Sequence, residues 1–361
     1  FSSGSESLDL FGYNRNEIKY YRTRTPYTEI FALFGQKKEQ YAKLLHTQNI
    51  TKQWNIALNM LRLRSEGFYN RQNCTDNNIS ISTNYTSKNN RYSLLANGII
   101  NSIKTDENGG VRNDTVFESN LFVNKKLISV NILEARARRG NREFTVSQFL
   151  NFGRKDTSLK TDSSSKKIIP RNSFSFSFHL KENWFVYEDK NPSSGFYEDV
   201  FFDSTLTHDS THIFSFSNAV ALKSYLMKNI FAEISFEQKN TRLVEYNADS
   251  SLAIDTTFSD QMVKFEIGNM TRKDKSKGFF WNIGKQYVLT GTHKGDDYVY
   301  GTIAYVFKKN KKISFKYKDS YHSVPFIYNY YKSNHFWWRN SFDKISERKM
   351  KLSYLDPKHK F

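Results

Sequence analysis

Apolar and polar residues alternate along much of the chain, most clearly in the stretch RNSFSFSFHLK at residues 171–181. Three phenylalanines and a leucine occupy one side of an extended backbone here, and serines, His179 and Lys181 occupy the other. Successive side chains of a strand point to opposite faces, so this pattern predicts a strand with one apolar and one polar face. In a soluble β-sandwich the apolar face would cover a protein core, whereas in a membrane barrel it would meet lipid.

The same alternation recurs in many segments, among them residues 54–60, 78–86, 263–268, 312–318 and 349–354. The links between such segments are alternately short, as expected for residues 86–91 and 344–348, and long. Outer-membrane barrels combine short periplasmic turns with longer outer loops, and a soluble sandwich has no reason to sort its links in this way. The sequence therefore predicts an all-β fold, a transmembrane antiparallel up-and-down β-barrel of about 14–16 strands.

We expect a single β-barrel domain over residues 1–361, with residues 1–24 as an N-terminal lead-in. Residues 104–140 are interpreted as a long loop that is able to fold into the lumen. Two places depart from the pattern. The link 154–170 is long where a short one is expected, and residues 36–49 carry apolar side chains at helical spacing.

The composition agrees with a chain rich in strands and turns, since aromatic residues make up 16% of it and only five prolines are present. It contains no apolar run of about 18 residues, which excludes a transmembrane helix. The mean hydropathy of −0.68 is compatible with a barrel, because alternation hides the lipid face from window averages. The chain begins at Phe1 without Met or a signal-like segment, so either a leader was removed or the sequence starts within a longer chain.

The formal net charge is +18. Lysine and arginine lie mostly in predicted turns, such as residues 272–277 and 308–312, and they form no recognised nucleic-acid-binding motif. Basic turns can bind an acidic surface. We therefore expect the phosphates of outer-membrane lipids and lipopolysaccharide as partners, and no nucleic acid.

Six segments resemble, in their order along the chain, the outer-membrane porin-like β-barrel family of Bacteroidetes. They are TPYTEIFALFG (25–35), NITKQWNIALNMLRLRSEGFYNRQ (49–72), YTSKNNRYSLLANG (85–98), ENGGVRND (107–114), SSGFYEDVFFDSTLTHDST (193–211) and SNHFWWRN (333–340). The resemblance implies a β-barrel in the outer membrane of a Gram-negative bacterium, with porin activity. It transfers no functional residues to this chain.

The alternation also assigns candidate residues to the two faces. The candidate lumen-facing residues are His179, Lys181, Lys264, Glu266, Lys316 and Lys318. The aromatic residues that could anchor a barrel at the bilayer interface are Trp54, Trp184, Trp281, Tyr330, Tyr331, Trp337 and Trp338. The predicted inner faces carry more lysine than glutamate, so an open lumen is expected to favour anions over cations.

Asp203, His208, Asp209 and His212 lie close together in the sequence, and carboxylates and imidazoles can bind a divalent metal. Their spacing matches no metal-site motif, and a polar outer loop accounts for them as well. The chain has no nucleophile elbow, phosphate-binding loop or dinucleotide fingerprint. We therefore expect no enzymatic activity and no cofactor.

The sequence thus favours an outer-membrane porin that allows passive diffusion of small polar or anionic solutes. One alternative is a barrel subunit of an outer-membrane secretion or assembly complex, with protein partners and without channel activity. A second alternative is a soluble β-sandwich that binds glycans or mediates adhesion. Solubility without detergent would select the sandwich, and a stable co-purifying protein would favour the assembly role.

Overall fold

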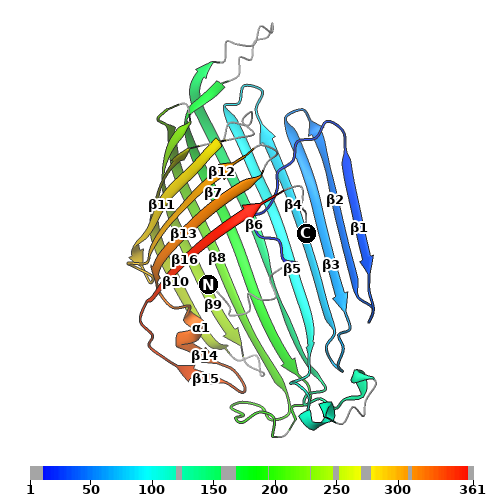
Figure 1. Ribbon diagram of the computed structural model, residues 1–361. Coiled ribbons are helices and arrows are strands. Elements are labelled where there is room, and N and C mark those ends of the chain that lie inside the picture. Colours follow the sequence, from blue (N-terminus) through cyan, green and yellow to red (C-terminus); the bar gives the residue numbers. More distant parts are fainter. Residues whose placement is uncertain are drawn as a thin grey trace.

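The computed structural model describes residues 11–118, 124–155, 168–193, 195–227, 229–246, 252–269, 278–307 and 311–356. Fourteen strands form one strongly curved antiparallel sheet, in which each strand pairs with its neighbours in the sequence (Figure 1). The strands are β1 (Tyr27–Phe34), β2 (Gln40–Thr51), β3 (Trp54–Ser65), β4 (Cys74–Thr86), β5 (Tyr92–Glu107), β6 (Ala135–Lys155), β7 (Ile168–Asp189), β8 (Thr207–Tyr225), β9 (Ile230–Tyr246), β10 (Leu252–Asn269), β11 (Gly278–Gly291), β12 (Asp297–Val306), β13 (Lys312–His322) and β16 (Ile345–Leu355). This confirms the predicted all-β, up-and-down architecture and its strand number.

A 14-stranded sheet accompanied by one two-stranded hairpin overturns the alternative of a soluble β-sandwich, which needs two large sheets packed face to face. The strands β1 and β16 are the two edges of the sheet, and no pairing joins them within the described residues. Every residue of β1 is exposed. No helix in the described part of the chain is long and apolar enough to cross a membrane.

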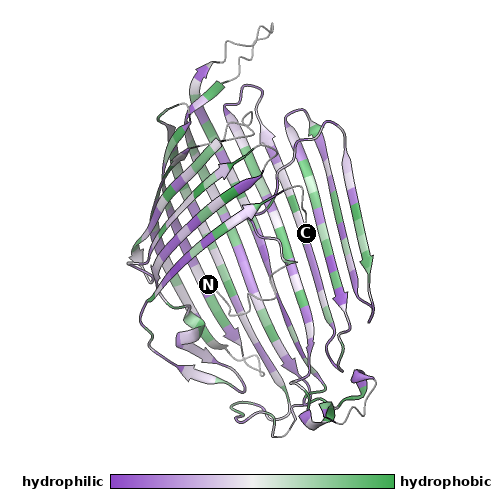
Figure 2. Ribbon diagram, viewed as in Figure 1, coloured by the Kyte–Doolittle hydropathy of each residue, from purple (hydrophilic) through white to green (hydrophobic). Residues whose placement is uncertain are grey.

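The two faces of the sheet differ in polarity, and the alternation is visible along the strands in Figure 2. The convex face carries exposed apolar side chains on almost every strand, including Met60, Ile81, Ile100, Phe144, Phe176, Phe216, Phe236, Phe265, Ile303 and Phe315. The concave face carries buried polar side chains, including Asn55, Asn59, Asn78, Ser80, Ser82, Asn97 and Asn101. An apolar band on the outer face around a polar interior is the arrangement of a membrane-spanning barrel.

The links between strands alternate in length over β2–β9, as the sequence predicts, but not over β9–β13. The strand bounds leave short links at residues 52–53, 87–91, 226–229 and 307–311. Links at the opposite end of the sheet include 66–73, 108–134, 190–206 and 323–344. The links 247–251 and 292–296, which lie at the end with the longer links, span five residues each, whereas the link 270–277 at the opposite end spans eight. Most of the irregular link predicted at residues 154–170 falls outside the described residues, because β6 extends to Lys155 and β7 begins at Ile168.

Two segments differ from the pattern that the sequence indicates. Residues 40–49 belong to strand β2, although their apolar positions have helical spacing. Tyr41 and Leu45 lie on the concave face and Leu44 on the convex face, so this strand is apolar on both sides and loses its simple alternation. The predicted short turn at residues 344–348 lies largely within β16, and the link that precedes it is long.

That long link, residues 323–344, contains the short helix α1 (Phe326–Asn329) and a small hairpin of β14 (Tyr330–Lys332) and β15 (Trp337–Arg339). The link 108–134 contains two short 3-10 helices, at Asp114–Phe117 and Lys125–Leu127. In Figure 1 its described residues lie beyond the ends of β5 and β6. Gly109 and Ile132 line a cavity together with Tyr187 and Asp209 of the concave face. Residues 104–107 and 135–140 of the predicted loop belong to β5 and β6.

Candidate functional site

Two segments cover parts of the concave face, and the first is the chain before β1. Residues 11–24 run along β4 and β5 without forming a strand of the sheet. The amide of Asn101 donates to the carbonyl oxygen of Tyr13 (2.8 Å), and its oxygen accepts from the backbone N–H of Tyr13 (2.9 Å). Further bonds to this segment come from Asn78, Ser82, Asn84 and Asn97. Amide and hydroxyl side chains can satisfy an extended backbone, which explains why these concave positions are asparagine and serine.

The second segment is the link 323–344. Phe326 of α1 and Tyr330 of β14 pack against an apolar cluster on the concave face of β8, β9 and β10. The cluster consists of Ile213, Leu243, Ile254 and Phe258. Burial of these side chains holds the helix and its hairpin against the inside of the sheet.

Asn334, in the turn between β14 and β15, anchors this link to the link 190–206. Its side chain is completely buried, and its amide oxygen accepts from the backbone N–H groups of Phe202 (3.1 Å) and Asp203 (3.0 Å). Its amide nitrogen donates to the carbonyl oxygen of Asp203 (2.7 Å) and to Oγ1 of Thr207 (3.1 Å). The backbone N–H of Asn334 donates to Asp209 (2.9 Å).

His335 completes the same contact. Its Nδ1 lies 2.8 Å from the carbonyl oxygen of Asp199, and its Nε2 lies 2.6 Å from Oγ1 of Thr207. A carbonyl oxygen can only accept, so Nδ1 carries the proton. The imidazole stacks on Tyr197 with ring centres 3.7 Å apart. Burial and the hydrogen bond with Tyr187 raise the pKa of the Tyr197 phenol.

We call this contact between residues 197–209 and residues 333–336 the loop latch. Its two sides lie in two of the segments through which the sequence resembles a porin-like family. The sequence order alone does not indicate that they touch, and the structure brings them together across more than a hundred residues.

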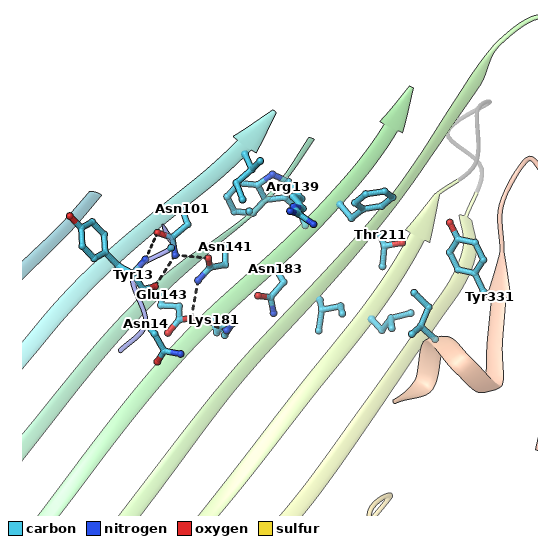
Figure 3. Close-up of a pocket in the computed structure, with 18 of the residues that line it drawn as sticks. Tyr13, Asn14, Asn101, Arg139, Asn141, Glu143, Lys181, Asn183, Thr211 and Tyr331 are labelled. Atoms are coloured by element: carbon cyan, nitrogen blue, oxygen red, sulfur yellow. Dashed lines mark hydrogen bonds and ion pairs between the residues drawn. The ribbon is translucent and has the colours of Figure 1, made fainter. Parts of the chain in front are cut away.

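A cavity of about 560 Å³ lies between the two covering segments and the sheet (Figure 3). Its polar side is formed by side chains of β5, β6 and β7, namely Asn101, Arg139, Asn141, Glu143, Lys181 and Asn183. Its apolar side is formed by Phe185, Ile213, Leu243, Ile327, Tyr328 and Tyr331. Such a mixed lining can accept polar solutes while restricting their size.

Within this cavity, Glu143 of β6 is buried, and neighbouring basic side chains balance its negative charge. Lys181 Nζ lies 2.8 Å from its Oε1, and His179 Nε2 lies 3.4 Å from its Oε2. The amide of Asn141 donates to the same carboxylate (2.8 Å). The two candidate lumen residues of β7 therefore lie on the concave face and share one carboxylate.

The other candidate lumen residues also lie on the concave face. Lys264 and Glu266 of β10 form an ion pair (2.9 Å), and the hydroxyl of Tyr300 donates to Glu266 (2.7 Å). Lys316 and Lys318 of β13 lie in a different part of the face, directly opposite two lysines of β16. The structure thus brings the candidates together in three separate groups.

The aromatic candidates divide into two groups. Trp54 and Trp281 lie on the convex face, each near the start of a strand and toward the same end of the sheet. Trp184 also lies on the convex face, with the guanidinium of Arg142 5.2 Å from its ring centre. These positions suit an interfacial girdle.

The remaining four aromatic candidates are not in the wall of the sheet, which corrects the girdle prediction for them. Tyr330, Tyr331, Trp337 and Trp338 belong to the β14–β15 hairpin. Tyr331 packs against Trp338, with ring centres 4.7 Å apart, and lines the cavity. Aromatic clustering was the signal in the sequence, and packing inside a curved sheet uses aromatic residues as readily as a lipid interface does.

The structure does not bring the four metal-ligand candidates together, and no group of three or more possible ligands is present among the described residues. His208 and Asp209 are consecutive in β8, so their side chains point to opposite faces. Asp209 accepts from Asn334, and His212 lies 3.6 Å from Glu182 on the convex face. Asp203 caps a turn, where the hydroxyl and amide of Thr205 lower the pKa of its carboxyl.

The chain is similar to a protein family and to several solved structures. No curated protein matches the chain. Similar solved structures include a Pseudomonas aeruginosa FadL homologue (11% identity, TM-score 0.42, covering 79% of this chain and 71% of that one). Others are the CymD monoaromatic hydrocarbon channel (8%, 0.36, 83% and 81%) and the Pseudomonas putida toluene transporter TodX (8%, 0.34, 81% and 81%). A family model matches residues 2–361, and the chain therefore belongs to the family described as "Putative porin".

Proposed function

We propose that this protein is an outer-membrane channel through which small polar solutes diffuse passively, with a preference for anions. Membership of a porin family and the apolar convex face support a position in the outer membrane of a Gram-negative bacterium. The polar concave face supports a path for solutes. The observation that carries the anion preference is a group of lysines on β13 and β16.

This group, which we call the lysine face, consists of Lys312, Lys316, Lys318, Lys349 and Lys351. Lys316 lies opposite Lys351, and Lys318 lies opposite Lys349. Like charges directly opposite each other destabilise a sheet, so stability does not account for the arrangement. A row of positive side chains along a watery path would instead attract anions.

Little negative charge offsets the lysine face. Within the described β13 and β16, Glu347 is the one acidic side chain on the concave side, 2.7 Å from Lys349 and 4.0 Å from Lys318. Neither Lys316 nor Lys351 has an acidic partner among the described residues. The N-terminal segment over β4 and β5 adds four more basic residues against one acidic residue, namely Arg15, Lys19, Arg22 and Arg24 against Glu17.

Reversing the charge of Lys316 and Lys351 tests this proposal. The native protein in a planar bilayer under a KCl gradient should give a reversal potential that indicates anion preference. The Lys316→Glu/Lys351→Glu variant should shift that potential toward cation preference, because both side chains are exposed on the concave side. The difference should shrink at high salt, since exposed charges are screened over about 10 Å at 0.1 M.

Lys88→Glu is the matched control, because Lys88 is exposed in the short link between β4 and β5 and should leave the potential unchanged. Cation preference of the native protein, or equal potentials for the native protein and the double variant, would rule out the anion path.

A second candidate function is a barrel subunit of an outer-membrane assembly complex without channel activity. It is favoured by the two segments that cover much of the concave face, residues 11–24 and 323–344. The bilayer recording separates the two functions. A folded protein that gives no conductance and co-purifies with a protein partner would select the assembly role.

A further inference from the structure

The convex face changes from apolar to basic at one level on β3–β6. In the register of the sheet, Met60 lies opposite Ile79, Ile79 opposite Ile100, and Ile100 opposite Arg142. One further step along the strands, the row across β3–β6 reads Arg62, Asn77, Ser102 and Gly140. The next row reads Arg64, Thr75, Lys104 and Arg138. Four basic side chains thus lie directly beyond the apolar band, and a fifth, Arg142, lies at its edge.

We call Arg62, Arg64, Lys104, Arg138 and Arg142 the basic rim. All five are exposed, and they belong to neighbouring strands about 4.8 Å apart, so the rim spans roughly 14 Å from β3 to β6. It lies toward the end of the sheet with the long links 66–73 and 108–134. In an outer-membrane barrel this end faces the outside of the cell.

Two of the five side chains of the rim form ion pairs with acidic neighbours, and Arg64 interacts electrostatically with Glu66, which is itself paired with Lys38 (2.6 Å). Arg138 lies 3.0 Å from Glu188, and Arg142 lies 3.5 Å from Glu182. The described residues provide no ion pair for Arg62, Arg64 or Lys104. The rim therefore keeps an excess of three positive charges at the boundary of the apolar band.

We propose that the basic rim binds the phosphate groups of an outer-leaflet glycolipid, whose acyl chains lie on the apolar band below. Guanidinium groups bind phosphate oxygens in pairs, and clustered basic residues next to a membrane-embedded surface attract phosphate-bearing lipids. The exposed Met60, Ile81, Ile100 and Phe144 lie below the rim and offer a surface for acyl chains. A free phosphate ion would bind the basic rim alone and would make no contact with this apolar surface. This inference rests on the outer-membrane location in the proposed function.

The test compares two triple variants of the full chain in detergent. Arg62→Gln/Arg64→Gln/Lys104→Gln removes the unpaired charges of the rim. Lys52→Gln/Lys88→Gln/Arg91→Gln removes the same charge from the short links at the other end of β2–β5. Binding of diphosphorylated lipid A, of lipid A without phosphates, and of inorganic phosphate is measured by native mass spectrometry and calorimetry.

We expect the native protein and the short-link variant to bind diphosphorylated lipid A equally well, and the rim variant to bind it roughly a hundredfold more weakly, about fivefold for each side chain. Lipid A without phosphates should bind the native protein as weakly as the intact lipid binds the rim variant. Equal binding by both triple variants, or tight binding of inorganic phosphate without binding of the lipid, would overturn the proposal. Conductance of the rim variant should stay at the native level. Lipid binding without conductance would contradict the proposed channel function but not the proposed lipid-binding role of the basic rim.

Discussion

Replacing Phe176 or Phe265 with arginine should lower the free energy of unfolding of this protein by about 2–4 kcal/mol. Both side chains lie on the convex face, where they are 39% and 49% exposed, and each has one apolar cross-strand neighbour, Val220 for Phe176 and Ile234 for Phe265. Their neighbours on the other side are Gln148 and Lys285. An arginine there would have to place its charge in hydrocarbon, or distort the bilayer to reach water. Reversible unfolding in detergent or lipid vesicles measures the loss.

Two concave substitutions are the controls for this experiment. Ser175→Arg puts the same group on the next residue of β7, which faces inward. Lys264→Arg keeps a positive charge beside Glu266, 2.9 Å from the present ammonium. Both should cost far less than the convex variants. Equal losses on the two faces would show that the convex band does not lie in lipid.

The face on which each strand residue lies could be predicted from the sequence, because odd-numbered and even-numbered residues of a strand point to opposite faces. Once Phe174 and Phe176 are placed outward, Ser175, His179 and Lys181 must point inward, and the pairing register carries this parity from strand to strand. The same reasoning explains the failure at β2. Apolar side chains on both faces of Tyr41–Leu45 erase the signal on which the parity argument depends.

The segments that cover the concave face could not be predicted in the same way. Residues 11–24 form no strand. Most of their hydrogen-bond partners are side chains of β4 and β5 some 60–90 residues later in the sequence, and Asn49 of β2 is a further partner. Asparagine and serine at alternate positions of β4 are compatible with a watery lumen as well as with a bound backbone. Periodicity describes which way a side chain points, but it does not describe what lies opposite.

The structure also shows where many of the basic residues behind the net charge of +18 lie. The basic residues singled out here belong to the lysine face on the concave side, to the N-terminal segment, and to the basic rim on the convex side. The sequence-based expectation of phosphate partners assigned the turns to that role. The proposed lipid site instead uses Arg62, Arg64 and Lys104, which lie within strands β3 and β5 and not in turns.

Replacing Asn334 with leucine should release the link 323–344 from the concave face. Leucine has a similar size but cannot hydrogen-bond, so the backbone N–H groups of Phe202 and Asp203 and the carbonyl oxygen of Asp203 would lose their partner. Each buried polar group left unpaired costs about 1–3 kcal/mol. The sum is comparable to the whole stabilisation that a short helix and a two-stranded hairpin gain by packing on four apolar side chains.

The expected results are faster proteolysis within residues 323–344 and a higher single-channel conductance, because α1 and Tyr331 would no longer narrow the cavity. Asn340→Leu is the control. Asn340 is exposed and makes one side-chain hydrogen bond, to the carbonyl oxygen of Tyr328 (2.9 Å), so its loss should change neither quantity appreciably. Proteolysis and conductance that are identical in the native protein and the Asn334→Leu variant would show that the apolar packing of Phe326 and Tyr330 holds the link without the loop latch.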